Sequence, residues 1–119
     1  MRNSFRAMSV ATVALTLIGT IACSTAIAEK KSVTGKSLAF NKKKGNCLAC
    51  HVIAGGTQPG NIAPPLVAMK ARFPDKAVLR AQIADPHAKN PSSMMPPFSS
   101  HGILSEKEID MIVDYIHAL

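Results

Sequence analysis

Apolar residues recur at three- and four-residue steps near the end of the chain, as an amphipathic helix requires. They are Ile109, Ile112, Val113, Ile116 and Leu119. Ser105 and Glu108 stand in the spacing of a capping box, in which each side chain bonds the other residue's backbone N–H. The pattern therefore predicts a helix from 106 to 119 with one face in the core.

Three shorter segments also have helical patterns. Thr34 can cap a helix through about residue 43, ended by Gly45, and residues 66–73 place Leu66, Met69 and Phe73 on one side. Asp75 can cap a helix over 76–84. Residues 55–65 and 86–102 are rich in Gly or Pro and lack a period, so they are predicted as long loops. No convincing strand appears, and the predicted fold class is all-α.

The first 28 residues have the pattern of a secretory signal peptide. Arg2 and Arg6 precede an apolar stretch over 8–22, and residues 26–28 form a small-x-small cleavage site. A retained anchor is disfavoured because Ser, Thr and Gly interrupt the stretch. Lipid attachment at Cys23 is less favoured because Thr20 is a poor residue three places before it. We expect cleavage after Ala28, a periplasmic domain over 29–119, and no stable membrane insertion.

Composition shows how little the mature chain has for building a core. The 119 residues are 47% hydrophobic but only 4% aromatic, with no Trp. Removing residues 1–28 lowers the Lys+Arg count from 14 to 12, so the net charge falls from +7 to +5, and only two of the three Cys remain. A small, aromatic-poor domain with two long loops needs something to fill its centre. A cofactor between the loops would do so.

Residues 47–51 read Cys-Leu-Ala-Cys-His, the C-x-x-C-H signature of c-type haem attachment. The spacing lets both sulfurs, of Cys47 and Cys50, form thioethers on one porphyrin edge while His51 faces the iron. A redox dithiol would need a βαβ context, a zinc site would need further ligands, and a Cys47–Cys50 disulfide would stabilise little. One copy of the motif predicts one haem c.

The sixth iron ligand must come from elsewhere in the chain. Met69 and Met111 fall on or near apolar helical faces, where core packing is the simpler explanation, and His101 and His117 read as surface residues. Met94 and Met95 lie in a Pro-rich loop, and Pro96 stiffens the chain after Met95. We favour Met95 as the distal ligand, with Met94, a histidine such as His87, or an open site as alternatives. A thioether ligand raises the reduction potential, which suits electron transfer.

A run of lysines, residues 42–44, precedes the haem motif, with Lys30, Lys31 and Lys36 upstream. The run is either a solvated surface or a docking surface for an acidic partner. Nucleic acid is an improbable partner for an exported chain without stacking aromatics. Glu106 and Glu108 in the first turns of the last helix are accounted for by the helix dipole.

From Gly35 to Leu119 the chain resembles the class I cytochromes c, and among them the SoxX family, the monohaem subunit of the SoxAX sulfur-oxidation cytochrome. The general signals are the haem motif and Met95-Pro96. The more specific ones are Lys43-Lys44-Gly45-Asn46-Cys47, Asn90-Pro91 and Met95-Pro96-Pro97-Phe98.

The resemblance implies that the first and last helices cross beside the haem, with Phe40 meeting Ile112 or Tyr115. It implies His51 as the proximal iron ligand and Met95 as the distal one. It also implies that the Pro64 carbonyl accepts a hydrogen bond from His51 and orients its ring. Ala63 stands where the family commonly has Gly.

The resemblance also implies a function. The chain would be the electron-transfer subunit of a heteromeric L-cysteine S-thiosulfotransferase, with no catalytic residue of its own. A SoxA-like haem subunit would hold the site that joins thiosulfate to a cysteine of a SoxYZ-type carrier. This subunit would pass the electrons to a small periplasmic cytochrome c. The alternative is a free electron carrier serving an oxidase or a dehydrogenase.

Overall fold

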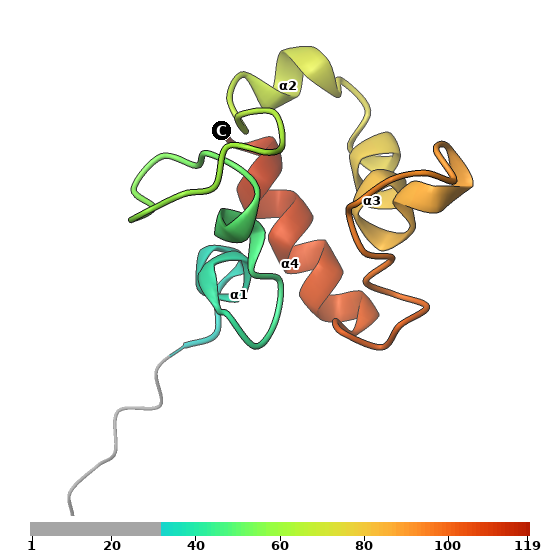
Figure 1. Ribbon diagram of the computed structural model, residues 1–119, viewed down its shortest axis with the longest axis horizontal. Coiled ribbons are helices and arrows are strands. Elements are labelled where there is room, and N and C mark those ends of the chain that lie inside the picture. Colours follow the sequence, from blue (N-terminus) through green and yellow to red (C-terminus); the bar gives the residue numbers. More distant parts are fainter. Residues whose placement is uncertain (1–31) are drawn as a thin grey trace, which may run out of the picture. The chain divides into compact units, whose positions relative to one another are not determined.

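The structure, a computed structural model, describes residues 32–119. The predicted signal segment and Cys23 lie outside this range. The described part is helical and contains no strand, so the all-α prediction is confirmed (Figure 1). Its elements are α1 (Gly35–Phe40), the 3-10 helix η1 (Cys47–Ala49), α2 (Met69–Arg72), α3 (Lys76–Ala84), the 3-10 helix η2 (Pro86–Ala88) and α4 (Glu106–His117).

Helix α4 forms the centre of this domain, with α1 and α3 packed against it (Figure 1). Its predicted apolar face is buried: Ile109, Ile112, Val113 and Ile116 are each at most 2% exposed. The predicted capping box is present, because Ser105 Oγ accepts the Glu108 N–H at 3.3 Å and the Glu108 carboxylate accepts the Ser105 N–H at 2.9 Å. Within residues 32–119, no helix has the length and apolar character that crossing a bilayer would demand.

Helix α1 is shorter than its sequence pattern predicts. Thr34 caps it as expected, through a capping box with Ser37. The helix ends at Phe40 because Asn41 turns to extended backbone angles and donates its N–H to the Leu38 carbonyl. A turn then leads to Asn46 in the left-handed region, at φ +46°. The prediction of helix to residue 43 was therefore wrong by one turn.

Helix α2 is also shorter than predicted, whereas α3 has the predicted bounds. The Leu66 N–H donates to the Val52 carbonyl at 2.9 Å, and the Ala68 N–H donates to the Leu119 carbonyl at 3.0 Å. Ala68 itself stands in the left-handed region, at φ +50°, a conformation that a right-handed helix does not include, so α2 begins only at Met69. The Asp75 side chain caps α3 by accepting the Ala77 N–H at 2.8 Å.

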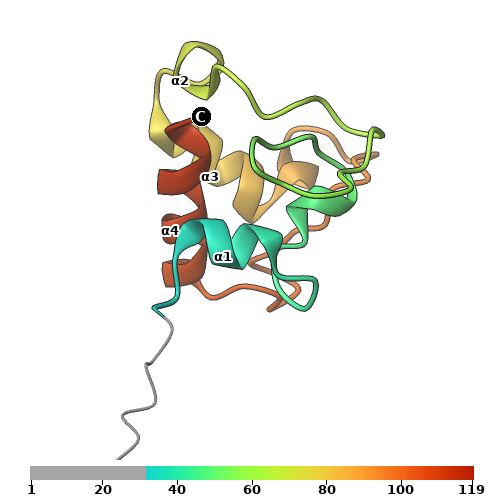
Figure 2. The ribbon, with the colours of Figure 1, turned by 90° about the vertical axis from the view of Figure 1, so that its left-hand side faces the viewer.

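The contact between α1 and α4 depends on a glycine. A Cβ placed on Gly35 would lie 1.9 Å from the carbonyl oxygen of Met111, well inside van der Waals contact. Only glycine lets the start of α1 lie this close to the backbone of α4 (Figure 2). Further along, the Phe40 and Tyr115 rings meet edge to face with centroids 6.1 Å apart, which confirms the expected contact of Phe40 with the last helix.

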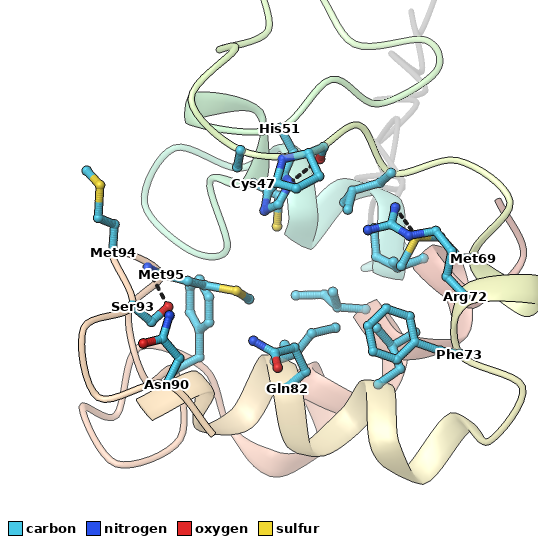
Figure 3. Close-up of a pocket in the computed structure, with 18 of the residues that line it drawn as sticks. Cys47, His51, Met69, Arg72, Phe73, Gln82, Asn90, Ser93, Met94 and Met95 are labelled. Carbon is cyan, nitrogen blue, oxygen red and sulfur yellow. Dashed lines mark hydrogen bonds between the residues drawn. The ribbon is translucent and has the colours of Figure 1, made fainter. Parts of the chain in front are cut away.

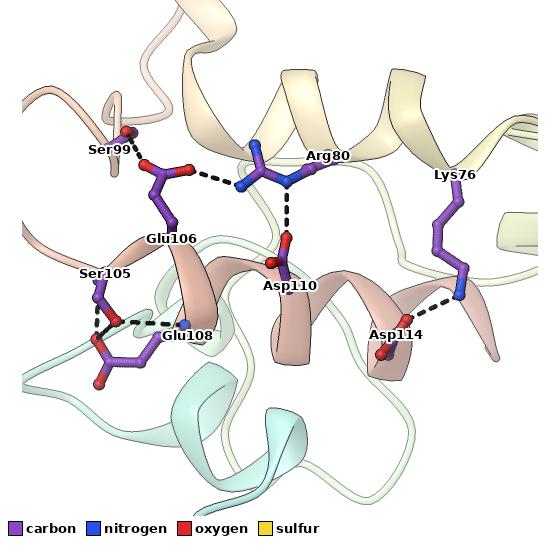
Figure 4. A network of polar contacts seen from close by, with 8 residues as sticks. All are labelled: Lys76, Arg80, Ser99, Ser105, Glu106, Glu108, Asp110 and Asp114. Carbon is purple, nitrogen blue, oxygen red and sulfur yellow. Dashed lines mark hydrogen bonds and ion pairs between the residues drawn. The ribbon is translucent and has the colours of Figure 1, made fainter.

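Ion pairs join α3 to α4 on the solvent side (Figure 4). Arg80 contacts Glu106 at 2.6 Å and Asp110 at 2.7 Å, and Lys76 contacts Asp114 at 2.8 Å. Glu106 also accepts a hydrogen bond from Ser99, in the loop before α4. The helix dipole therefore explains the position of Glu106 only in part, because its side chain also connects α3 to the loop before α4.

We predict that Gly35→Ala destabilises the protein by about 1–3 kcal/mol, the usual cost of overpacking. The added methyl group would force α1 away from Met111. Chemical unfolding of the haem-loaded protein measures the change. Lys107→Ala, on the exposed side of α4, is the control and should shift the free energy of unfolding by less than about 0.5 kcal/mol. Equal effects of the two substitutions would contradict the close-contact account.

We also predict that stability falls in acid. The Ser99 hydroxyl and then Arg80 hold the pKa of Glu106 below its ordinary value. The Ser105 N–H and then Lys44 do the same for the pKa of Glu108. In the unfolded chain these carboxyls bind protons at a higher pH, so their contribution is present above about pH 4.5 and is lost as the pH falls through the lowered pKa values.

The free energy of unfolding, measured between about pH 6 and pH 3, should therefore decrease, and Glu108→Gln should flatten that decrease. Lys107→Ala should leave the pH dependence as in the parent protein. An unchanged pH dependence in Glu108→Gln would show that Glu108 does not contribute to it.

Candidate functional site

A cavity of about 520 Å³ lies between α3, α4 and the two long loops (Figure 3). This volume is within the range of about 300–1,000 Å³ usual for cofactor pockets. Its walls are mostly apolar, and those from the helices and adjoining loops include Met69, Leu79, Ile83, Phe98, Ile112 and Ile116. A second hollow of about 310 Å³ shares Cys47, His51, Met95 and Phe98 with the first. The small core left by few aromatic residues is thus matched by a large apolar space.

The C-x-x-C-H segment forms one edge of this cavity. Its single turn is closed by the Cys50 and His51 N–H groups, which both donate to the Cys47 carbonyl, at 3.3 and 2.9 Å. Gly45 is buried beneath the segment, and a Cβ there would lie 3.0 Å from the Leu38 carbonyl and 3.3 Å from Cys47 Sγ. The turn therefore lies directly on α1. Cys47 and Cys50 are half-buried and are not joined by a disulfide.

Burial raises the pKa of the Cys47 thiol to about 11. Desolvation is the main cause, because a thiolate loses its hydration in this position. A thioether carries no charge and suffers no such penalty. The surroundings of Cys47 thus suit a neutral, covalently linked sulfur better than a reactive thiolate or a metal-bound one.

The loop over residues 53–66 returns along the haem motif through a series of backbone bonds. The Gly60 N–H donates to the Leu48 carbonyl at 2.7 Å, and the Ala63 N–H donates to the Cys50 carbonyl at 3.1 Å. A Cβ on Gly60 would lie 2.0 Å from the Ala49 carbonyl oxygen, so the two segments are in close contact. Ala63 is not among the described residues with positive φ, and the absence of glycine there causes no backbone strain.

This return places the Pro64 carbonyl oxygen 2.7 Å from Nδ1 of His51. A carbonyl only accepts hydrogen bonds, so Nδ1 carries the proton and Nε2 keeps a free lone pair. The ring is half-buried at the cavity edge, beside Cys47 (Figure 3). His51 is thereby held in the tautomer that a metal ligand needs.

The loop between η2 and α4 brings Met95 into the cavity from the other direction (Figure 3). Its side chain is half-buried and reaches inward, whereas Met94 is 85% exposed and points away. The Met95 N–H donates to Ser93 Oγ at 3.2 Å. Both methionines line the space that His51 borders, but of the two only Met95 is half-buried and reaches into it.

The remaining candidate ligands are placed as follows. Met69 is 2% exposed and packs in the core, as expected, and Met111 is partly buried and packs against the same core. His101 is exposed, also as expected. His117 differs from the expectation of a surface residue, because it is half-buried with Nε2 3.1 Å from the Phe73 carbonyl oxygen. It joins the end of α4 to the segment after α2.

Sequence reasoning gave no role to Arg72, which lines the cavity at the end of α2. Its Nη1 donates to the Pro65 carbonyl at 2.8 Å and lies 3.4 Å from Met69 Sδ. Arg72 therefore fixes the segment next to Pro64, the partner of His51. The sequence carried two signals for it: its position three residues after Met69, on the same side of a short helix, and the Arg72-Phe73 pair, which belongs to the family resemblance.

The basic run is divided by the fold. Lys44 is half-buried and pairs with Glu108 at 2.9 Å, while Lys42 and Lys43 are exposed. The Lys36 ammonium lies 5.5 Å from the centre of the Phe40 ring, at cation–π distance. Lys42 and Lys44 border the second hollow.

Comparisons with known proteins agree with this site. Residues 34–116 match the family described as cytochrome C oxidase, cbb3-type, subunit III. A protein of Aquifex aeolicus (strain VF5) described as an uncharacterized lipoprotein is 37% identical over 94 residues, which is 75% of this chain and 43% of that protein. The chain thus spans less than half the length of this curated relative.

A solved structure, that of SoxXA from P. pantotrophus, superposes with a TM-score of 0.63 at 26% identity, covering 70% of this chain and 77% of the other. The cavity, the family match and this superposition agree with one another. The chain belongs to the cytochrome c family, whose members bind haem c covalently, and it is a class I cytochrome c close to SoxX.

Proposed function

We propose that this electron-transfer cytochrome is the SoxX-like subunit of a periplasmic SoxAX-type complex. The observation that carries the proposal is the superposition on SoxXA, over 70% of the chain at 26% identity. The cavity adds support, because His51 and Met95 both border it (Figure 3).

We assign four side chains and one carbonyl to a single haem c. Cys47 and Cys50 supply the sulfurs for its covalent attachment, and His51 and Met95 supply the proximal and distal iron ligands. When bound, the haem supplies one-electron cycling between ferric and ferrous iron. The Pro64 carbonyl holds the His51 proton on Nδ1, which strengthens Nε2 as a donor to a metal.

The rest of the cavity controls how readily an electron is accepted. Leu79, Ile83, Ile112 and Ile116 are at most 7% exposed and exclude water from the walls. A dry site with a neutral imidazole and a neutral thioether disfavours the extra positive charge of ferric iron. These residues therefore favour the reduced state. With His51 and Met95 both bound to the iron, no ligand position would remain for a substrate. The described residues supply positioning and electrostatics, with no bond-making step of their own.

By this proposal, a SoxA-like subunit carries the catalytic site. That site joins a sulfur of thiosulfate to a cysteine of a SoxYZ-type carrier. As the S–S bond forms, the thiol proton is released and two electrons leave. The present subunit accepts them one at a time and passes them to a small periplasmic cytochrome c. The exposed Lys42 and Lys43 offer positive charge for an acidic docking partner.

The competing function is that of a free electron carrier serving an oxidase or a dehydrogenase. The matched family is described as a subunit of a cbb3-type oxidase, which supports an oxidase as the electron-transfer partner. The two functions use the same cavity and ligands, so they differ in the partner alone.

For the unprocessed chain we propose export, cleavage after Ala28 and a mature periplasmic domain over 29–119. The A. aeolicus relative is described as a lipoprotein, which favours the alternative of lipid attachment at Cys23. In either case the haem motif would reach the same compartment.

We predict that Met95→Ala abolishes the weak charge-transfer absorbance of a methionine–ferric iron bond and lowers the reduction potential. The reason is the loss of the thioether that stabilises ferrous iron. Absorption spectra of the purified haem-loaded protein measure the first effect, and a redox titration measures the second.

Met94→Ala is the matched control, since Met94 is the neighbouring residue and 85% exposed. It should keep both the band and the potential. A band that survives Met95→Ala and disappears in Met94→Ala would transfer the distal role to Met94.

We predict that the native protein from thiosulfate-grown source cells elutes in a complex with a second haem-containing subunit. Gel filtration followed by haem staining and mass spectrometry of the fractions identifies that subunit. Elution of this chain alone under the same conditions would refute the SoxX-like assignment and favour the free carrier.

A further inference from the structure

A short series of hydrogen bonds links His87 to the backbone of Met95. His87 lies in η2, directly after α3, and is half-buried. Its Nε2 lies 2.9 Å from the carbonyl oxygen of Ser93. Ser93 in turn accepts the Met95 N–H on its own side-chain oxygen, at 3.2 Å. The ring of His87 is thus two hydrogen bonds away from the residue that enters the cavity.

The chemistry of these groups fixes the direction of the first bond. The Ser93 carbonyl has no proton to give, so His87 Nε2 must donate. This bond uses the nitrogen that a histidine most often offers to a metal. His87, which sequence reasoning kept as an alternative iron ligand, is therefore already committed to Ser93.

His87 is itself firmly placed. The Asp85 carboxylate accepts its backbone N–H at 3.0 Å, and Pro86 beside it is buried. The Asn90 N–H donates to the Pro86 carbonyl at 3.0 Å, and the Ser93 N–H donates to the Asn90 carbonyl at 2.9 Å. These bonds connect the loop to the end of α3, so the imidazole is a rigid support for Ser93.

The position of Ser93 decides which methionine faces the cavity. Met94 and Met95 are adjacent and carry the same thioether, yet Met95 reaches inward while Met94 is 85% exposed (Figure 3). A rotation of the backbone after Ser93 would direct the Met94 side chain into the cavity and the Met95 side chain out of it. The donor at His87 and the acceptor at Ser93 Oγ hold the backbone on either side of this point.

We propose that His87 is the positioning residue that keeps Met95, and not Met94, directed at the haem iron. The proposal rests on the proposed ligation by Met95 and goes beyond it, because His87 touches neither the iron nor the Met95 side chain. Loss of the His87 donor loosens the loop, so an added ligand displaces Met95 from the iron more easily.

The experiment compares His87→Gln with His87→Glu in the haem-loaded ferric protein. The two side chains match in length, but only the Gln amide can donate to the Ser93 carbonyl at neutral pH. Imidazole is titrated in, and loss of the methionine–iron charge-transfer absorbance reports displacement of Met95. We expect imidazole to bind His87→Glu about 2- to 10-fold more tightly than the parent protein, the effect of losing one hydrogen bond.

His87→Gln should restore the parent affinity for imidazole to within about 2-fold, the lower limit of a single hydrogen bond's effect. His87→Ala, which introduces no charge, should behave like His87→Glu. His101→Ala, at an exposed histidine of the same loop region, is the matched control and should leave the affinity unchanged.

The outcomes separate this proposal from the one on which it rests. If the parent protein shows the charge-transfer band but all His87 variants bind imidazole as the parent does, His87 has no positioning role and Met95 remains the ligand. If imidazole bound His87→Gln and His87→Glu equally tightly, and both more tightly than the parent protein, the proposal would also be overturned, because the donor would then not matter. A parent protein without the band would refute ligation by Met95, and the role of His87 with it.

Discussion

The backbone contact between Gly35 and Met111 is the constraint on which the rest of the domain depends. It brings α1 onto α4 without an intervening side chain, and it places the half-buried Phe40 against Tyr115. The chain then turns back over the end of α1 at Gly45, where Cys47 begins the haem motif. One face of α4 thus packs against α1, while Ile112 and Ile116 also form a wall of the cavity.

The two sides of the cavity are assembled by independent sets of bonds. His51 is oriented by the segment immediately after it, through short-range bonds such as that to Pro64. Met95 is oriented by the end of α3, and Glu106 connects the later part of its loop to Arg80. A local change on one side therefore leaves the support of the other intact, which allows each of the two proposed ligands to be adjusted separately.

The sequence predicted those features whose causes are local. The starts of α3 and α4 follow from Asp75 and Ser105, whose capping bonds involve residues two or three positions away. The later start of α2 was not predicted from the sequence, because it depends on the left-handed backbone of Ala68, whose N–H donates to the distant Leu119 carbonyl. The same division holds at the site. C-x-x-C-H and Met95 carry recognisable motifs, whereas Arg72 and His87 act through backbone carbonyls that have no sequence signal.

The loop over residues 53–66, which returns along the haem motif, offers a place where the chain could be extended. Its base is closed by the bond from the Gly60 N–H to the Leu48 carbonyl and by the contact of Gly60 with Ala49. Residues 57–59, at its tip, are exposed and carry none of the bonds that orient His51. The tip is therefore the natural point for insertion of additional sequence. A tether attached there would link this cytochrome to an electrode or a fused domain while leaving the ligand geometry untouched.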